Sequence, residues 1–198
     1  MLRGMSQTYV IKVSASVQEK VHAKDRRVKQ LVLTEIVDRE EQRAILKEQL
    51  KERGWEEQPD GRWRRKRGEV VETLDLGDMT VEAEVELEKT LERSRTIVVR
   101  GDRDFEEQER RRQREQSELE KSIAITDDEK RRAESVLQRE IADKLDESEE
   151  ERQDELNEVV RGVYAESLKR KARRLGTVTE VREGTAGQDY ELVIKITQ

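Results

Sequence analysis

A long stretch without helix breakers, from Thr126 to Leu175, constrains the fold of this chain more than any other feature. It holds no proline and a single glycine, Gly162, and Gly176 follows it directly. Thr126 and Glu129 have the spacing of a capping box, in which each side chain hydrogen-bonds the backbone N–H of the other residue. A continuous helix of this length would extend about 73 Å at 1.5 Å per residue, so we predict that it protrudes from the core.

Charged residues make up 44% of the 198-residue chain, and hydrophobic residues make up 32%. Average globular domains have about 25% and 45–50% respectively, so the apolar side chains cannot hold the whole chain around one core. A chain this polar is either disordered or built on long solvated helices. Apolar positions recur here with clear helical and strand periods, which favours an ordered, partly helical fold.

The residue types present exclude several kinds of chemical site. The chain has no cysteine and one histidine, His22, so a thiolate metal site or histidine-based acid–base catalysis lacks the residues it needs. No glycine-rich phosphate loop stands between a strand and a helix. We therefore expect no cofactor, no metal site and no enzymatic activity.

Targeting and membrane signals are also missing from the sequence. No apolar run is long enough for a membrane-spanning helix, and residues 1–10 lack the apolar core of a signal peptide. The absence of cysteine suits a reducing compartment, so we expect a cytoplasmic protein without a membrane partner. The net charge of −6 provides no overall attraction for phosphate backbones.

The first hundred residues show several strand patterns. Residues 9–18 alternate apolar and polar side chains, as in a half-buried strand. A polar turn is expected at His22–Arg26. The β-branched residues 28–37 then predict a second strand, with a helix as the alternative. Residues 96–100 predict a further short strand.

A helix is predicted directly after residue 37. Asp38 is expected to be its N-cap, with Glu41 completing a pattern like a capping box. Ile45, Leu46 and Leu50 supply an apolar face, and Gly54 stands where a helix-ending glycine belongs.

Two hairpins are predicted further along the chain. Residues 70–88 alternate on both sides of Gly77-Asp78, which is a hairpin signal. Placing Leu74 opposite Val81 buries every large apolar residue of both strands on one face, so this register is strongly specified. Residues 177–196 predict a closing hairpin. Its last strand turns four apolar side chains inward: Tyr190, Leu192, Ile194 and Ile196.

Residues 102–157 are highly charged and predict a helical arm resembling a coiled coil. Five apolar residues are expected to meet across two antiparallel helices and to serve as the arm's contact surface: Leu119, Ile123, Leu137, Ile141 and Leu145. Ser148 and Arg152 interrupt the apolar stripe. A stripe this weak would not hold a lone helix, but it would suit the helix of a partner.

These elements together predict an α+β fold. Residues 1–101 and 158–198 would form one domain, a twisted antiparallel sheet of about six or seven strands covered by one or two helices. Residues 102–157 would form a long projecting charged helical hairpin.

The stretch from Gly54 to Val70 holds both tryptophans, the only proline and five cations. Its Pro59-Asp60-Gly61 sequence suits a turn that pairs Glu57 with Trp63 and places both indoles on one face. A β-bulge is expected at Gly68.

Two interpretations of this hairpin stay open. In the structural one, the indoles belong to the core and glutamates match the cations, with Arg67 facing Glu88. In the other, the hairpin binds single-stranded nucleic acid through indole stacking and cation contacts. The residues that would bind are Trp55, Trp63, Arg62, Arg64, Arg65, Lys66 and Arg67.

Three segments carry a resemblance to a known family: the helix ending in "LKERGWE", the strands around "VEAEVEL", and the helix "VVRGVYAESLKRKARRLG". The order strand, helix, meander, helix and two strands resembles the plastid and cyanobacterial reading-frame family of the DUF1257 type. The charged section between Asp102 and Asn157 departs from that family, and no functional residue can be matched. The resemblance implies an accessory component of an ATPase-linked multi-gene system.

The function that we expect is that of a non-enzymatic adaptor or accessory subunit of a multi-protein complex. It would bind protein partners through the helical arm and the sheet edge, and the resemblance implies an ATPase-containing complex as partner. One alternative is the single-stranded nucleic-acid-binding module described above. Another is a self-associating structural protein, a homo-oligomer that pairs the arm with its own copy.

Overall fold

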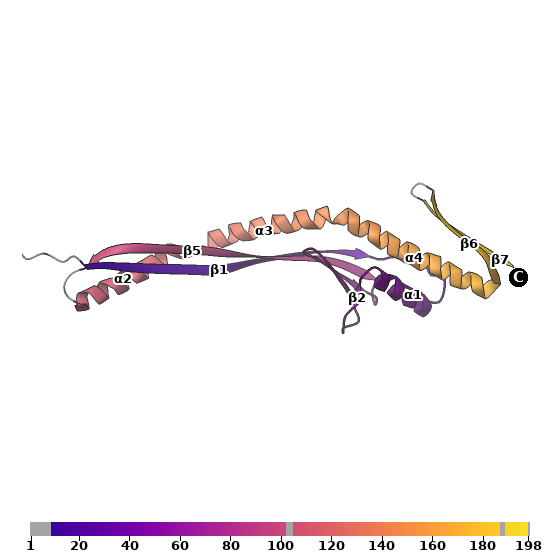
Figure 1. Ribbon diagram of the computed structural model, residues 1–198, viewed down its shortest axis with the longest axis horizontal. Helices are drawn as coiled ribbons and strands as arrows, with labels where there is room; N and C mark the ends of the chain where they lie inside the picture. The colour runs from indigo at the N-terminus through magenta and orange to yellow at the C-terminus, as the bar shows by residue number, and fades with distance from the viewer. Residues whose placement is uncertain (1–8, 102–104, 187–188, 198) are drawn as a thin grey trace, which may run out of the picture. The chain divides into compact units, whose positions relative to one another are not determined.

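The computed structural model describes residues 9–101, 105–186 and 189–197. Within them it has seven strands and four helices, and it confirms the predicted α+β class (Figure 1). The strands are β1 (Tyr9–Gln30), β2 (Glu56–Glu57), β3 (Trp63–Arg67), β4 (Val70–Asp75), β5 (Thr80–Gly101), β6 (Thr177–Ala186) and β7 (Asp189–Thr197). The helices are α1 (Arg39–Glu52), α2 (Phe105–Ile123), α3 (Asp127–Glu147) and α4 (Glu149–Leu175).

Five strands form one sheet in the order β1-β5-β4-β3-β2, and β6 and β7 form a separate two-stranded sheet. The chain divides into two compact units, to both of which β1, β5 and α3 contribute. The first unit comprises Met1–Ala23 and Leu87–Glu140, and the second comprises Lys24–Glu86 and Ile141–Gln198.

The predicted domains follow other boundaries than these two units. The sequence predicts that a sheet domain (residues 1–101 and 158–198) folds independently of an arm (residues 102–157). That division stays a prediction, and its boundary at residue 102 lies outside the described residues.

The first strand continues through the polar stretch, so the predicted turn at His22–Arg26 is wrong. β1 has 22 residues, and Val21 and Ala23 continue the buried side of the alternation. The polar side chains that follow Ala23 form ion pairs with β5: Lys24–Glu84 at 2.8 Å and Arg26–Glu82 at 3.2 Å. Polar residues on the exposed face of a long strand have the composition of a turn, which explains the error.

The central meander has the predicted register. Leu74 lies opposite Val81 between β4 and β5, and Glu57 lies opposite Trp63 between β2 and β3. The predicted bulge at Gly68 is wrong, because β3 and β4 reverse through a tight turn there with Gly68 at φ 57°. The reversal itself brings the apolar residues of the two strands onto one face.

The core of the second unit joins this meander to α1 and α4. The buried residues of its cluster are Leu31, Val37, Ile45, Leu46, Leu50, Trp55, Trp63, Leu74, Leu76, Val81, Leu156, Val159 and Val163. Helices α1 and α4 approach closely at Gly162, where an added methyl group would overlap the side-chain amide of Gln49, so a larger residue there would require Gln49 to move.

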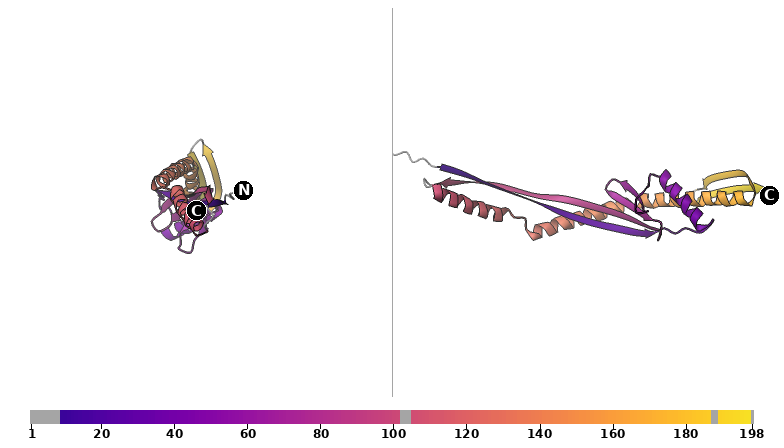
Figure 2. Two further views of the ribbon diagram at one scale, coloured as in Figure 1. Left: turned by 90° about the vertical axis from the view of Figure 1, so that its left-hand side faces the viewer. Right: turned by 90° about the horizontal axis from the view of Figure 1, so that it is seen from below.

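In the first unit, α2 packs on a strand. Leu119 and Ile123 lie in one core cluster with Val13 and Ala15 of β1, and Leu137 is buried outside that cluster. Figures 1 and 2 show α2 and the first part of α3 following one another along the strands. The predicted projecting hairpin of paired helices is therefore wrong: the alternating apolar face of β1 covers the α2 stripe.

The capping box that opens the long helical stretch is confirmed. The Thr126 N–H donates to Glu129 Oε2 at 2.9 Å, and the Glu129 N–H donates to Thr126 Oγ1 at 3.3 Å. Helix α3 starts directly after it.

The stretch is not one helix, because Ser148 separates α3 from α4. Arg152, which interrupts the apolar stripe, is 7% exposed. Its guanidinium donates to the Leu145 carbonyl at 2.9 Å and pairs with Glu149 at 2.7 Å. The arginine therefore satisfies a carbonyl at the end of α3. No helix in the described part of the chain is long and apolar enough to cross a membrane.

We predict that Trp63→Ala lowers the free energy of unfolding by about 3–5 kcal/mol, because the indole is fully buried and its removal leaves a cavity. Urea unfolding followed by circular dichroism measures the change. Arg64→Ala on the exposed side of the same strand is the control and should stay within about 0.5 kcal/mol of the wild type. Equal effects of the two substitutions would contradict this assignment of Trp63 to the core.

We also predict that Glu129 titrates far below an ordinary glutamate. Its pKa lies at about 2 instead of 4.5, because the Thr126 backbone N–H, then the Arg93 guanidinium and the Thr126 hydroxyl, bond the carboxylate. The stability that it contributes is therefore complete above pH 4.5 and is lost as the pH falls toward 2.

Titration of the side-chain carboxyl by NMR measures this pKa directly. Glu129→Gln should remove the corresponding acid-dependent loss of stability, whereas Glu134→Gln, an exposed glutamate on the same helix, should leave it in place. A pKa near 4.5 for Glu129 would show that the capping box is open in solution.

Candidate protein-binding site

Both tryptophans of the basic hairpin belong to the core. Trp55 is 3% and Trp63 0% exposed, and both lie in the cluster that joins the meander to α4. The predicted shared face of the two indoles is therefore confirmed. Neither indole has a free face on which a base can stack.

Arg65 lies at the centre of a buried ion cluster. It is bound to Glu72 of β4 at 2.5 Å and also to Glu155 of α4, and its guanidinium lies 4.9 Å from the centre of the Trp55 ring. The side chains of Arg65 and Glu72 are 10% and 1% exposed. This cluster connects the meander to the helix that covers it.

Arg67 extends the cluster toward α4. It pairs with Glu151 at 2.6 Å and with Glu155, so its predicted position opposite Glu88 is wrong; on the sheet it lies opposite Val70. Burial alone would raise the pKa of Glu155, but the hydrogen bonds from Arg67 and Arg65 outweigh burial and lower it. The carboxylate stays charged between the two guanidinium groups.

The remaining cations of the hairpin lie at the surface. Arg62 pairs with Asp75 at 3.3 Å, whereas Arg64 and Lys66 are exposed and have no ion pair among the described residues. The structure therefore leaves only part of the predicted basic set accessible to a ligand.

The five residues predicted as the contact surface of the arm are all buried. Leu119, Ile123, Leu137, Ile141 and Leu145 are each at most 4% exposed. Their stripe is part of the interior, so it offers no surface to a partner in this structure.

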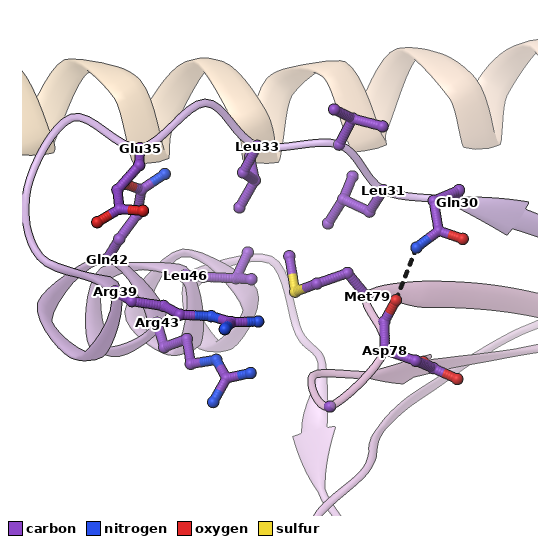
Figure 3. A pocket seen from close by; sticks show the side chains of 12 residues that line it. Gln30, Leu31, Leu33, Glu35, Arg39, Gln42, Arg43, Leu46, Asp78 and Met79 are labelled. Carbon is purple, nitrogen blue, oxygen red and sulfur yellow. Dashed lines mark hydrogen bonds between the residues drawn. The ribbon is translucent and has the colours of Figure 1, made fainter.

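A pocket of about 460 Å³ lies where the crossing segment, residues 31–38 between β1 and α1, passes α1 and the β4–β5 turn (Figure 3). We call it the α1 pocket. Its lining residues are Gln30, Leu31, Val32, Leu33, Glu35, Arg39, Gln42, Arg43, Leu46, Gly77, Asp78 and Met79. Figure 3 shows Leu31, Leu33, Leu46 and Met79 converging on its interior, with Arg39 and Arg43 extending from α1.

One wall of the pocket is held by Gln42, a buried residue of α1. Its side-chain amide donates to the Thr34 carbonyl at 2.8 Å and accepts from the Ile36 N–H at 3.0 Å. Asp38 caps the same helix by accepting from the backbone N–H groups of Glu40 and Glu41. These bonds fix the crossing segment against α1.

The opposite wall is the β4–β5 turn. The Leu31 N–H donates to the Met79 carbonyl at 2.7 Å, and the Gln30 side chain donates to the Asp78 carbonyl at 2.7 Å. Met79 has φ 58°, a left-handed conformation that is rare for a residue other than glycine. The sequence predicted a two-residue turn at Gly77-Asp78, but the last pair of the two strands is Asp75 with Thr80, so Met79 belongs to a wider turn.

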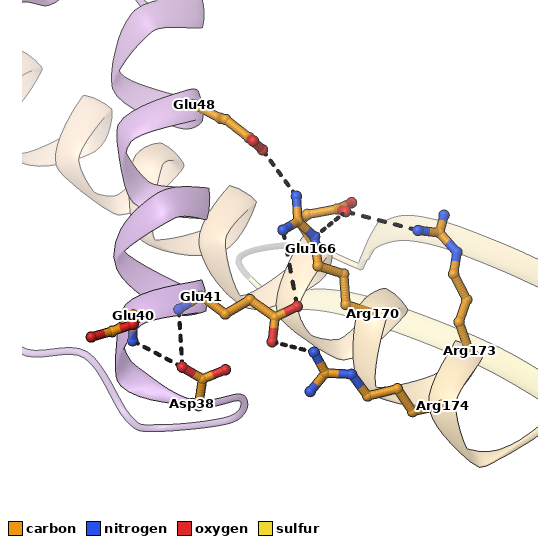
Figure 4. A network of polar contacts seen from close by, with 8 residues as sticks. All are labelled: Asp38, Glu40, Glu41, Glu48, Glu166, Arg170, Arg173 and Arg174. Carbon is orange, nitrogen blue, oxygen red and sulfur yellow. Dashed lines mark hydrogen bonds and ion pairs between the residues drawn. The ribbon is translucent and has the colours of Figure 1, made fainter.

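Arg39 and Arg43 give the pocket its positive charge. They stand one helical turn apart, and neither forms an ion pair with a described residue. Of the acidic residues on α1, Glu41 and Glu48 are engaged with α4: Glu41 binds Arg170 and Arg174, and Glu48 binds Arg170 (Figure 4). Asp78 accepts from Thr80, which leaves Glu35 as the other acid of the lining.

Sequence reasoning missed this pocket. A signal was present, because Arg39, Arg43 and Leu46 recur at the spacing of one helix face. The apolar floor depends on contacts between distant segments, and no local pattern reveals those. Chemically, an apolar floor under two arginines suits an aliphatic side chain next to a carboxylate.

We predict that Glu72→Ala lowers the free energy of unfolding by about 3–5 kcal/mol, because it leaves the Arg65 charge buried without this partner. Replacing both residues, with Arg65→Met and Glu72→Leu, should recover most of that loss, since the buried pair is then absent. Chemical unfolding of the three proteins measures the coupling. A double variant as unstable as the single one would show that the two charges do not act as a pair.

Comparison with known proteins places the chain in a family. A family model described as FtsH ternary system domain X5 matches residues 5–197, nearly the whole chain. Searches among curated proteins and among solved structures returned no match. The DUF1257-type family suggested by the order of elements is not the one that matches, although the implied ATPase-linked accessory role agrees with this result. The chain belongs to the FtsH ternary system domain X5 family.

Proposed function

We propose that this chain is a non-enzymatic adaptor of an FtsH-linked ATPase system and that it binds a protein partner in the α1 pocket. Membership of an FtsH ternary system implies partners in an ATPase-linked system. The observation that carries the choice of site is a pair of arginines, Arg39 and Arg43, that lie beside an apolar floor and form no ion pair with any described residue.

The surroundings of the pocket favour an acidic ligand. Several other cations of the second unit are matched by carboxylates; Arg170, for example, lies near Glu41, Glu48 and Glu166. Arg39 and Arg43 have no such partner in the described part of the chain, so they form a local positive site for an outside carboxylate on a chain of net charge −6. The ligand that fits is a peptide segment in which an acidic residue or a terminal carboxylate adjoins an aliphatic side chain.

The lining also favours binding over catalysis. It supplies guanidinium, amide and carboxylate groups and aliphatic surface, but no histidine, serine, threonine, tyrosine or lysine. Gln42, the most buried polar side chain of the lining, is committed to the backbone of the crossing segment. A rigid wall and a charged rim are what recognition of a peptide requires.

We predict that Arg39→Glu combined with Arg43→Glu removes the protein partners of this chain. The full-length tagged protein is purified from its native host, and co-purifying proteins are quantified by mass spectrometry. The matched control is Arg64→Glu with Lys66→Glu, which reverses two exposed cations outside the pocket. Loss of partners only in the pocket variant is expected.

Each outcome of this comparison has a distinct meaning. Retention of every partner by the pocket variant would contradict the α1 pocket as the binding site. Loss in the control variant instead would assign binding to the basic hairpin.

A peptide titration tests the ligand chemistry. Fluorescent peptides that end in Leu-Glu should bind the wild-type chain at least about tenfold more tightly than peptides that end in Leu-Lys, as expected for one charge-assisted contact. The preference should vanish in the pocket variant. Equal affinity for both peptides would refute recognition of an acidic side chain.

A further inference from the structure

The C-terminal hairpin is a two-stranded sheet separate from the main sheet. β6 and β7 pair antiparallel from Thr177 opposite Thr197 to Ala186 opposite Asp189, and the hairpin lies beside α4 (Figure 1). Isolated two-stranded sheets are marginally stable in water, and a third or fourth strand stabilises them.

One face of this hairpin is apolar and incompletely covered. The register places six apolar side chains on it: Val178, Val181, Tyr190, Leu192, Ile194 and Ile196. None of them is buried, and Val181 and Ile196 are 41% and 39% exposed. Contact with α4 thus leaves part of this face in water.

The two outer edges of the hairpin differ. The register of β6 shifts between Val178 and Glu180, where an extra residue interrupts the ladder. Such an irregularity blocks the addition of another strand. β7 is regular along its length, and its outer edge has no partner strand among the described residues. β7 is therefore the edge that can accept a strand.

We propose that β7 pairs antiparallel with β7 of a second copy of this chain, which joins two hairpins into one four-stranded sheet. A two-fold axis at Val193 places each Val193 opposite its own copy. Glu191 then faces Lys195 of the other copy on one side of the sheet. On the other side, Leu192 faces Ile194, and the apolar faces of both hairpins become continuous.

The charges on β7 select this register. An axis at Glu191 or at Lys195 would place like charges opposite each other, which destabilises a sheet. An axis at Leu192 would place Lys195 opposite Asp189 but would leave Glu191 opposite Val193, and an axis at Ile194 would place both charges opposite uncharged residues. Only an axis at Val193 satisfies the two charges twice, once on each side of the axis, as a self-complementary interface requires.

The ion pairs within one chain are compatible with this arrangement. Lys195 binds Glu180 of β6 at 2.5 Å, whereas Glu191 is exposed and has no ion pair among the described residues. In the dimer, Lys195 lies between Glu180 of its own chain and Glu191 of the other. Charges on an edge strand ordinarily prevent random strand addition; here they permit one partner and one register.

A cysteine placed on the axis tests the geometry. The chain has no cysteine, so Val193→Cys introduces a single thiol that faces its copy at about 4.5–5.5 Å between Cα atoms, within reach of a disulfide. Mild oxidation of the full-length protein should give a covalent dimer. Thr197→Cys on the same strand is the control, because position 197 lies far from its own copy in this register and should stay reduced.

Charge reversal tests the pairing without a covalent bond. Glu191→Lys places Lys opposite Lys195 twice, so sedimentation should show a dimer dissociation constant at least about tenfold weaker. Lys195→Glu should act likewise. An equimolar mixture of these two variants should dimerise, because each lysine of one chain then faces a glutamate of the other. Circular dichroism of each variant checks that the fold is retained.

A monomer at every concentration would overturn the proposal. So would a dimer that Glu191→Lys leaves unchanged, or equal cross-linking at positions 193 and 197. This test is independent of the α1 pocket: a dimer without peptide binding, or peptide binding by a monomer, separates the two proposals.

Discussion

The buried contact of Arg65 with Glu72 is the interaction on which the second unit depends. It lies under the Trp55 ring and reaches Glu155 of α4, so it connects β3, β4 and a helix that is distant in the sequence. Charges this deeply buried destabilise a fold unless each has its partner. The meander and α4 must therefore assume their places together, and the same helix α4 holds α1, with its pocket arginines, through Arg170.

Local patterns predicted part of this arrangement well. The registers of the meander and of the Trp hairpin were predictable because one face is buried, and a shift by one residue would expose all of it. The turn expected at His22–Arg26 failed because the polar side chains there pair with β5 across the sheet. The prediction of a helical arm was wrong for a related reason. The apolar stripe that contains Leu119 and Ile123 can pack on a strand as well as on a helix, and the spacing of these residues does not indicate which element they contact.

The α1 pocket could not be predicted from local patterns, because its walls depend on contacts between segments that are distant in the sequence. In the sequence, Gln42 has the pattern of an ordinary polar residue on an amphipathic helix. It is nevertheless buried, because its side chain hydrogen-bonds the Thr34 carbonyl and the Ile36 N–H of the segment after β1. Met79 reads as a strand residue, yet the wider turn places it in the pocket wall. Both roles arise from contacts between segments, whereas periodicity reports only the environment of one segment.

The core of the second unit also sets an order of events during synthesis. Trp63, Leu74 and Val81 belong to it, but so do Leu156, Val159 and Val163 of α4. At roughly 5–20 residues per second, a ribosome exposes the meander several seconds before α4 emerges. During that interval α1 is already synthesised and can pack on the indole, but the apolar surface that α4 later covers stays exposed to water, and such surface is what chaperones protect.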